Sequence, residues 1–167
     1  KTIEKEFRDV LKWLNVVDPG ANYSSALAVG ELGMGIWLLE GPDYMKWEED
    51  KGEVLYLYGI HDATVIEYIK HLCSVSQDHA FAYFYFTFSD MEKQNVLNML
   101  LSIIGQLLQG LSGQGLPNGV TNLYHNSKAI GKLPDIKALQ TMFSEIIKLS
   151  KKTFIILDAL DEFPKST

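Results

Sequence analysis

Phe154-Ile-Ile-Leu-Asp158, followed directly by Ala-Leu-Asp161-Glu162, is the stretch of sequence that decides the fold. Four apolar residues that end in an aspartate predict a buried strand, which brings one carboxylate to the edge of a sheet. Chemistry with a divalent cation and an activated water uses this arrangement, with one acid for the metal and another nearby as base. The complete string therefore favours the Walker B strand of a nucleotide hydrolase. The alternative is a core strand that ends in a solvated acidic turn.

The composition is that of one ordinary globular domain. The chain has 167 residues, of which 47% are hydrophobic and 22% are charged, so it can bury a sizeable core. The formal net charge is −6, and lysine and arginine form no cluster, which argues against nucleic acid as a partner. No apolar run reaches the roughly 18 residues of a membrane span, so no membrane partner is expected.

Single residues with reactive side chains give little sign of chemistry. The one cysteine, Cys73, has no partner for a disulfide, so we expect a reducing, cytoplasmic environment and interpret it as a small core residue. Among the histidines only His61, beside Asp62, lies where a ligand could bind, and no third ligand follows at metal spacing. Because the sequence starts at Lys1 without a methionine or a signal-like region, we expect a piece of a longer protein.

Hydrophobic periodicity predicts strands that alternate with helices. The predicted strands are Val54 to Tyr58, Ala80 to Phe88 and Phe154 to Leu157, and the predicted helices are Thr2 to Leu14, Pro42 to Glu49, about Thr64 to Cys73, Ser89 to about Gln109, and one from Pro134 onward. The aromatic run from Ala80 lacks polar alternation, which predicts a strand covered on both faces rather than a base-stacking surface. Residues 22–35 and 110–119 are predicted connectors. This alternation predicts an α/β fold with a parallel sheet, preceded by a helical lead-in over residues 1–50.

A Walker B strand normally accompanies a phosphate loop, G-x-x-x-x-G-K-[ST], between the first strand and its helix. Here the corresponding turn reads Gly59-Ile60-His61-Asp62-Ala63-Thr64, and no lysine follows before Lys70. Asp62 and the Thr64-x-x-Glu67 capping box would place side-chain oxygens on the N–H groups that a phosphate needs. Losing three charge-assisted hydrogen bonds costs roughly 5–9 kcal/mol. A micromolar site has about 8 kcal/mol in total, so ordinary phosphate-loop binding should be undetectable.

Further segments follow one another in a recognisable order: Trp13-Leu14, Asp18-Pro19, Asn22-Tyr23, Gly33 to Glu40, Leu55 to Ile60, Ala82 to Phe86, Glu92-Lys93-Gln94 and Ile156 to Glu162. Together they resemble the NACHT-type, STAND-class P-loop NTPase module of fungal incompatibility and NLR-like proteins, which is the nephrocystin-type N-terminal domain. Family members carry Pro-Gly-x-Gly-Lys-[Ser/Thr] after the Gly-Ile of the first strand. In this chain Gly59-Ile60 runs through His61-Asp62 into the helix, as if the core of the loop had been excised.

The resemblance implies a three-layer P-loop NTPase fold over residues 51–167, in which the nucleotide switches a signalling protein between closed and oligomeric forms. It assigns Asp158 to Mg²⁺ and Asp161 or Glu162 to orienting the water that attacks ATP or GTP, and Gly59 is a remnant of the phosphate loop. It also implies that a later strand lies between the first strand and the Asp158 strand, so the sheet is expected to be incomplete. Ankyrin or WD repeats of the same polypeptide, and further copies of the chain, are the implied partners.

Three functions remain open on the sequence. The first is a degenerate signalling module that keeps the Walker B acids and binds nucleotide poorly. The second is an active ATP or GTP hydrolase whose phosphate loop is missing only from this sequence. The third is a module that acts through protein contacts alone, with the acids as relics.

Overall fold

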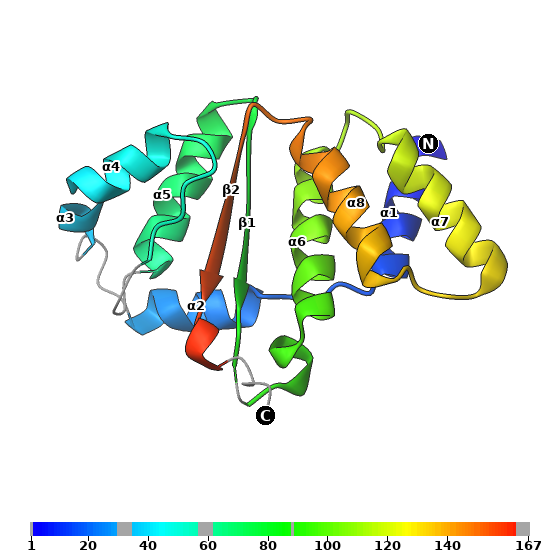
Figure 1. Ribbon diagram of the computed structural model, residues 1–167, viewed down its shortest axis with the longest axis horizontal. Helices are drawn as coiled ribbons and strands as arrows, with labels where there is room; N and C mark the ends of the chain where they lie inside the picture. The colour runs from blue at the N-terminus through cyan, green and yellow to red at the C-terminus, as the bar shows by residue number, and fades with distance from the viewer. Residues whose placement is uncertain (1, 30–34, 57–61, 88, 163–167) are drawn as a thin grey trace.

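Helices cover both faces of a two-stranded parallel sheet in the computed structural model, which describes residues 2–29, 35–56, 62–87 and 89–162 (Figure 1). The elements are α1 (Thr2–Leu14), α2 (Gly20–Val29), α3 (Ile36–Leu39), α4 (Pro42–Glu49), α5 (Asp62–Val75), β1 (His79–Tyr85), η1 (Met91–Gln94), α6 (Val96–Gly110), α7 (Asn118–Ile130), α8 (Ile136–Ile147), β2 (Lys152–Asp158) and η2 (Leu160–Glu162). The predicted α/β class is confirmed. Within the described ranges, every helix is too short or too polar to span a bilayer.

The two strands pair along their whole length, from His79 opposite Lys152 to Tyr85 opposite Asp158. The chain between them forms α6, α7 and α8, because a parallel pair needs a long crossover connection. The predicted parallel sheet and the strands at Ala80 and Phe154 are therefore confirmed, although β1 ends three residues before Phe88.

The third predicted strand, Val54 to Tyr58, is wrong for the three residues that the structure describes. Val54, Leu55 and Tyr56 have no regular secondary structure, and Leu57 and Tyr58 lie outside the described residues. The physical reason is the lack of a neighbour, since a strand exists only through hydrogen bonds to another strand and β2 pairs only with β1 among the described elements. Leu55 instead packs against an apolar cluster on one face of β2.

Apolar side chains alternate along β2 and feed a separate cluster on each face of the sheet. Ile155 and Leu157 pack with Ala82 of β1 against α6 and α8. Phe154 and Ile156 point the other way and pack with Tyr44 of α4 and with α5. The two helical layers of Figure 1 therefore depend on the period-two alternation of one short strand.

Helix α6 lies against β1 and contributes more residues to the larger cluster than any other element, and eight of its own residues are buried. Its Gln106 side chain binds the outer edge of β1: the Tyr83 N–H donates to Oε1 at 3.1 Å, and Nε2 donates to the Tyr83 carbonyl at 2.8 Å. One amide side chain thus pairs both backbone groups of Tyr83, as a neighbouring strand would. Gly105, the preceding residue, lies so close to Val16 that an added Cβ would be 2.5 Å from Cγ2 of that valine.

The structure differs from the predicted helices in several places. The segment from Ser89 to Gln109 is a short 3-10 turn, η1, followed by α6, because Asn95 is extended and accepts hydrogen bonds from the N–H groups of Leu97 and Asn98. The predicted connector 22–35 is helical up to Val29, and α7 occupies residues for which no helix was predicted. By contrast, α1 and α4 begin where the sequence predicts. Helix α8 begins at Ile136, two residues after the predicted start, and the Asp135 carboxylate caps it.

We expect Gln106→Ala to lower the free energy of unfolding by about 1–3 kcal/mol, because it leaves two part-buried backbone groups of Tyr83 unpaired. The matched control is Gln109→Ala on the exposed side of the same helix, which should change stability by less than about 0.5 kcal/mol. Urea unfolding followed by circular dichroism measures both. Equal losses in the two variants would contradict the role of Gln106.

Gly105→Ala should cost about 1–3 kcal/mol, because the new methyl group overlaps the stiff, β-branched side chain of Val16. Gly110→Ala in the last turn of the same helix meets no atom within 4 Å and should leave stability unchanged or raise it by up to about 1 kcal/mol. The same unfolding experiment compares the pair. A stable Gly105→Ala protein would show that the contact with Val16 is loose.

Candidate functional site at the end of strand β2

The acidic residues of the deciding sequence stretch gather at the carboxyl end of β2. Asp158 is the last residue of the strand, and its backbone carbonyl accepts a hydrogen bond from the N–H of Phe86 at 3.1 Å. Asp161 lies in the short turn η2 that follows. Both aspartates line one groove of about 1150 Å³, so the structure brings these two predicted site residues together.

The strained backbone of Ala159 brings the two aspartates into one groove. Its φ of 53° is in the left-handed region, which a residue with a Cβ adopts at a cost of roughly 1–2 kcal/mol. The reversal ends β2 and turns the chain directly into η2, which places Asp161 in the same groove as Asp158. Strain of this kind concentrates at functional sites, which makes this turn a candidate part of such a site.

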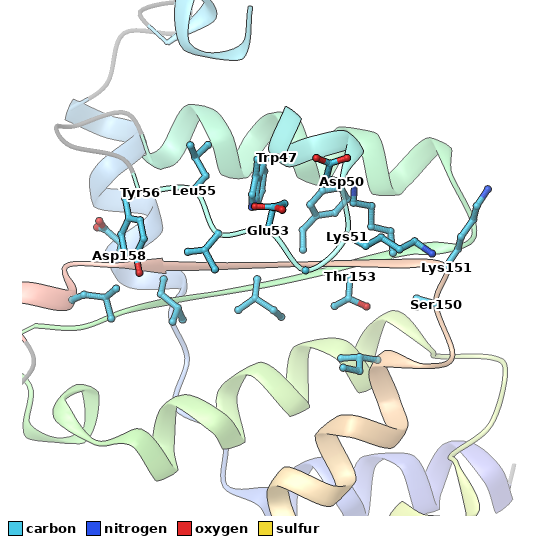
Figure 2. Close-up of a pocket in the computed structure, with 18 of the residues that line it drawn as sticks. Trp47, Asp50, Lys51, Glu53, Leu55, Tyr56, Ser150, Lys151, Thr153 and Asp158 are labelled. Carbon is cyan, nitrogen blue, oxygen red and sulfur yellow. The ribbon is translucent and has the colours of Figure 1, made fainter. Parts of the chain in front are cut away.

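The groove runs along β2 between two walls (Figure 2). One wall is formed by Trp47 of α4 and the irregular residues 50–56, and the other by Ile147, Ser150 and the side chains that β2 directs toward α8. Figure 2 shows Asp158 and Tyr56 near one end and Lys51 and Lys151 near the other, with Asp50 on the side of the lysines and Glu53 between the two ends. The groove is therefore acidic at the end of β2 and mixed in charge near its start. Sequence reasoning missed the contribution of residues 47–53, because nothing in their pattern shows which strand they lie beside.

The donor set for a metal is incomplete in the described part of the chain. No group of three histidine, cysteine, aspartate or glutamate side chains gathers there at a distance suited to a metal ion. Two of the predicted site residues cannot be placed, since Gly59 and the Glu162 side chain lie outside the described residues. Asp158 and Asp161 alone would leave most of the coordination sphere of a hard cation to water or to a ligand.

Helix α5 begins at Asp62, directly after Gly59-Ile60-His61. The predicted capping box at Thr64 is wrong, because Thr64 lies in the first turn of the helix and not before it. The first lysine of this helix, Lys70, lies near its other end, where its Nζ is 3.8 Å from Oε1 of Glu67 and 5.6 Å from the centre of the Tyr23 ring. No lysine of α5 therefore lies near the helix start.

Burial explains the raised pKa of two other groups near the sheet. The Cys73 thiol packs against the smaller cluster, and burial raises its pKa to about 11, so it is protonated at neutral pH and unsuited to nucleophilic attack. Burial also raises the pKa of Glu48 in α4, while Lys152 at the start of β2 opposes this shift. These findings support a core role for Cys73.

Comparison with known proteins gives one match. A family model described as "Nephrocystin 3, N-terminal" matches residues 33–167, which include both strands and the acidic groove. No curated protein and no solved structure matches the chain. The match covers well over half of the sequence and begins just before α3.

We expect Ala159→Val to destabilise the protein by about 1–3 kcal/mol, because a β-branched residue fits the left-handed region poorly. Ala159→Gly relieves the strain and should retain the stability of the original protein to within about 1 kcal/mol. Thermal unfolding of the two variants side by side measures the difference. Equal stability of the Ala159→Val and Ala159→Gly proteins would show that the turn accommodates a β-branched residue without strain.

Proposed function

Because this chain belongs to the nephrocystin 3 N-terminal family, we propose that it is a degenerate NACHT-type NTPase module of a multidomain signalling protein. It keeps the acids of a Walker B strand, Asp158 and Asp161, and binds nucleotide poorly. The observation that carries the proposal is the start of α5 at Asp62, which leaves only His61 between Gly59-Ile60 and the helix, too short a segment for a phosphate loop. The parallel pairing of β2 with β1 and the helices on both faces support a P-loop type of fold.

The residues present do not fit a Mg²⁺-bound nucleotide. Phosphate groups need backbone N–H groups, a lysine and a hydroxyl at the start of the helix. This chain has an aspartate there, and its nearest following lysine, Lys70, pairs with Glu67. A carboxylate at the helix start also repels an anion. Asp158 and Asp161 therefore make up only the acidic half of a nucleotide site.

The setting of the module follows from the same family. We place it in the cytoplasm, joined to ankyrin or WD repeats of the same polypeptide, where copies of the protein assemble without nucleotide control. The active-hydrolase alternative requires a loop that this sequence lacks.

Titration of the purified protein with a fluorescent ATP analogue and Mg²⁺ tests the proposal. We expect no saturable binding in the micromolar range, and the same flat titration for Asp158→Ala, because the phosphate-binding half of the site is missing. Saturable micromolar binding that Asp158→Ala abolishes would favour the active hydrolase instead.

A second variant distinguishes a degenerate nucleotide site from acids that are only relics. It carries Pro-Gly-Ser-Gly-Lys-Ser inserted between Ile60 and His61, which supplies the missing donors. If Asp158 still has a competent position, this variant should bind the analogue, and Asp158→Ala in the same background should weaken binding. A folded insertion variant without any binding would favour a module that acts only through protein contacts.

A further inference from the structure

The sheet has two edges in the described part of the chain. The open edge belongs to β2 and is the place that the resemblance gives to a later strand, whereas the other edge is the outer side of β1. The chain between α1 and α2 runs from one helical layer to the other (Figure 1). Leu14 of α1 is buried in the cluster under α6, and Tyr23 of α2 is buried against Ile66 of α5 and packs on Tyr83 of β1. This connection therefore crosses the sheet at β1.

The first residues of the connection, Val16 and Val17, dock on one stripe of α6. The stripe consists of Ser102, Gly105 and Gln106, which are small or polar residues at helical spacing in an otherwise apolar stretch of the helix. The Val16 side chain lies over Gly105, where an added Cβ would be 2.5 Å from its Cγ2. The Ser102 hydroxyl is fully buried and donates to the Val17 carbonyl at 2.8 Å. One side-chain contact and one hydrogen bond thus fix the position of the chain on α6.

The same stripe carries the Val17 contact on to the backbone of β1. Because the single hydroxyl proton of Ser102 is donated to Val17, its Oγ accepts from Gln106 Nε2, at 3.3 Å. This bond turns the amide of Gln106 so that Nε2 also reaches the Tyr83 carbonyl and Oε1 accepts from the Tyr83 N–H. The four groups form one directed chain of hydrogen bonds, from Tyr83 through Gln106 and Ser102 to Val17.

The last residue of the connection holds the other side of Tyr83. The Asp18 carboxylate accepts from the Gly20 N–H at 2.8 Å and turns the chain into α2. The Tyr23 ring, which is 8% exposed, then lies with its centre 5.3 Å from that of Tyr83. One segment therefore acts on the backbone of Tyr83 from the α6 side and on its ring from the α5 side.

We propose that residues 16–23 are a strap that closes the outer edge of β1, so that displacement of the strap opens the backbone of Tyr83 while the β1–β2 pairing persists. The strand from His79 to Tyr85 is rich in aromatic residues and contains no lysine, acidic residue or proline, which are the usual protection of an edge. A cover supplied by another segment takes their place. The strap does not depend on nucleotide, so its test is separate from that of the proposed function.

The test is amide hydrogen exchange of the whole chain, read as the exchange rate of Tyr83 divided by that of Phe84. The Phe84 N–H faces β2, because the Phe86 N–H two residues on is bonded to Asp158, so Phe84 reports the sheet itself. Ser102→Ala removes only the link between Val17 and Gln106, and should raise the ratio about tenfold. The matched control is Ser127→Ala, at a buried serine of α7, which should leave the ratio within about twofold of the original.

A second pair of variants moves the strap without changing any hydrogen-bonding side chain. Gly105→Ala pushes Val16 off α6 and should also raise the ratio about tenfold. Val16→Ala in the same chain removes both overlapping methyl groups and leaves Val16 Cβ at 3.4 Å from the new methyl group, an ordinary contact distance. The double variant should therefore return the ratio to within about threefold of the original.

Three results would overturn the proposal. The first is equal acceleration of Tyr83 and Phe84 by Ser102→Ala, which would show that the segment contributes only to global stability. The second is an unchanged exchange rate of Tyr83 in that variant, which would show that Gln106 closes the edge without the strap. The third is a raised ratio that persists in the Gly105→Ala, Val16→Ala double variant, which would place the effect within α6. If Gly105→Ala alone fails to fold, Ser102→Ala decides the question.

Discussion

The parallel hydrogen bonding between β1 and β2 is the constraint on which the rest of the described structure depends. It fixes the register from His79 opposite Lys152 to Tyr85 opposite Asp158. The register decides which side chains of β2 enter the cluster under α6 and which enter the cluster under α5. It also decides which backbone groups of β2 face the groove. The two helical layers, the position of Asp158 and the open edge all follow from this one pairing.

The parts of the fold that the sequence predicts well are those with local causes. The apolar run that ends in Asp158 predicts β2, the aromatic run predicts β1, and Asp135 predicts the start of α8. Helix α7 was missed although Val120, Tyr124 and Ser127 are buried at helical spacing, because the third is a small polar residue in a polar segment. The glycine-rich segment that precedes α7 also favours a loop over a helix start.

The errors have non-local causes. Val54 to Tyr56 has the composition of a strand, but a strand forms only beside a partner, and sequence pattern does not show whether the partner is present. The same limit applies to Gln106, whose bonds to Tyr83 join residues 23 positions apart, and to the wall formed by residues 47–56. At the site, the strand pattern was enough to predict the two aspartates. The groove that joins them to Lys51 could be identified only from the fold.

The edge of β2 that faces away from β1 and the acidic end of the groove consist of different groups of the same segment. The backbone N–H and C=O groups of Thr153, Ile155 and Leu157 face that edge, whereas Asp158 and Asp161 line the groove at and beyond the end of the strand. The left-handed Ala159 separates the two, since the strand geometry ends there. The position of the two aspartates therefore depends on the pairing of β2 with β1 and on the turn at Ala159.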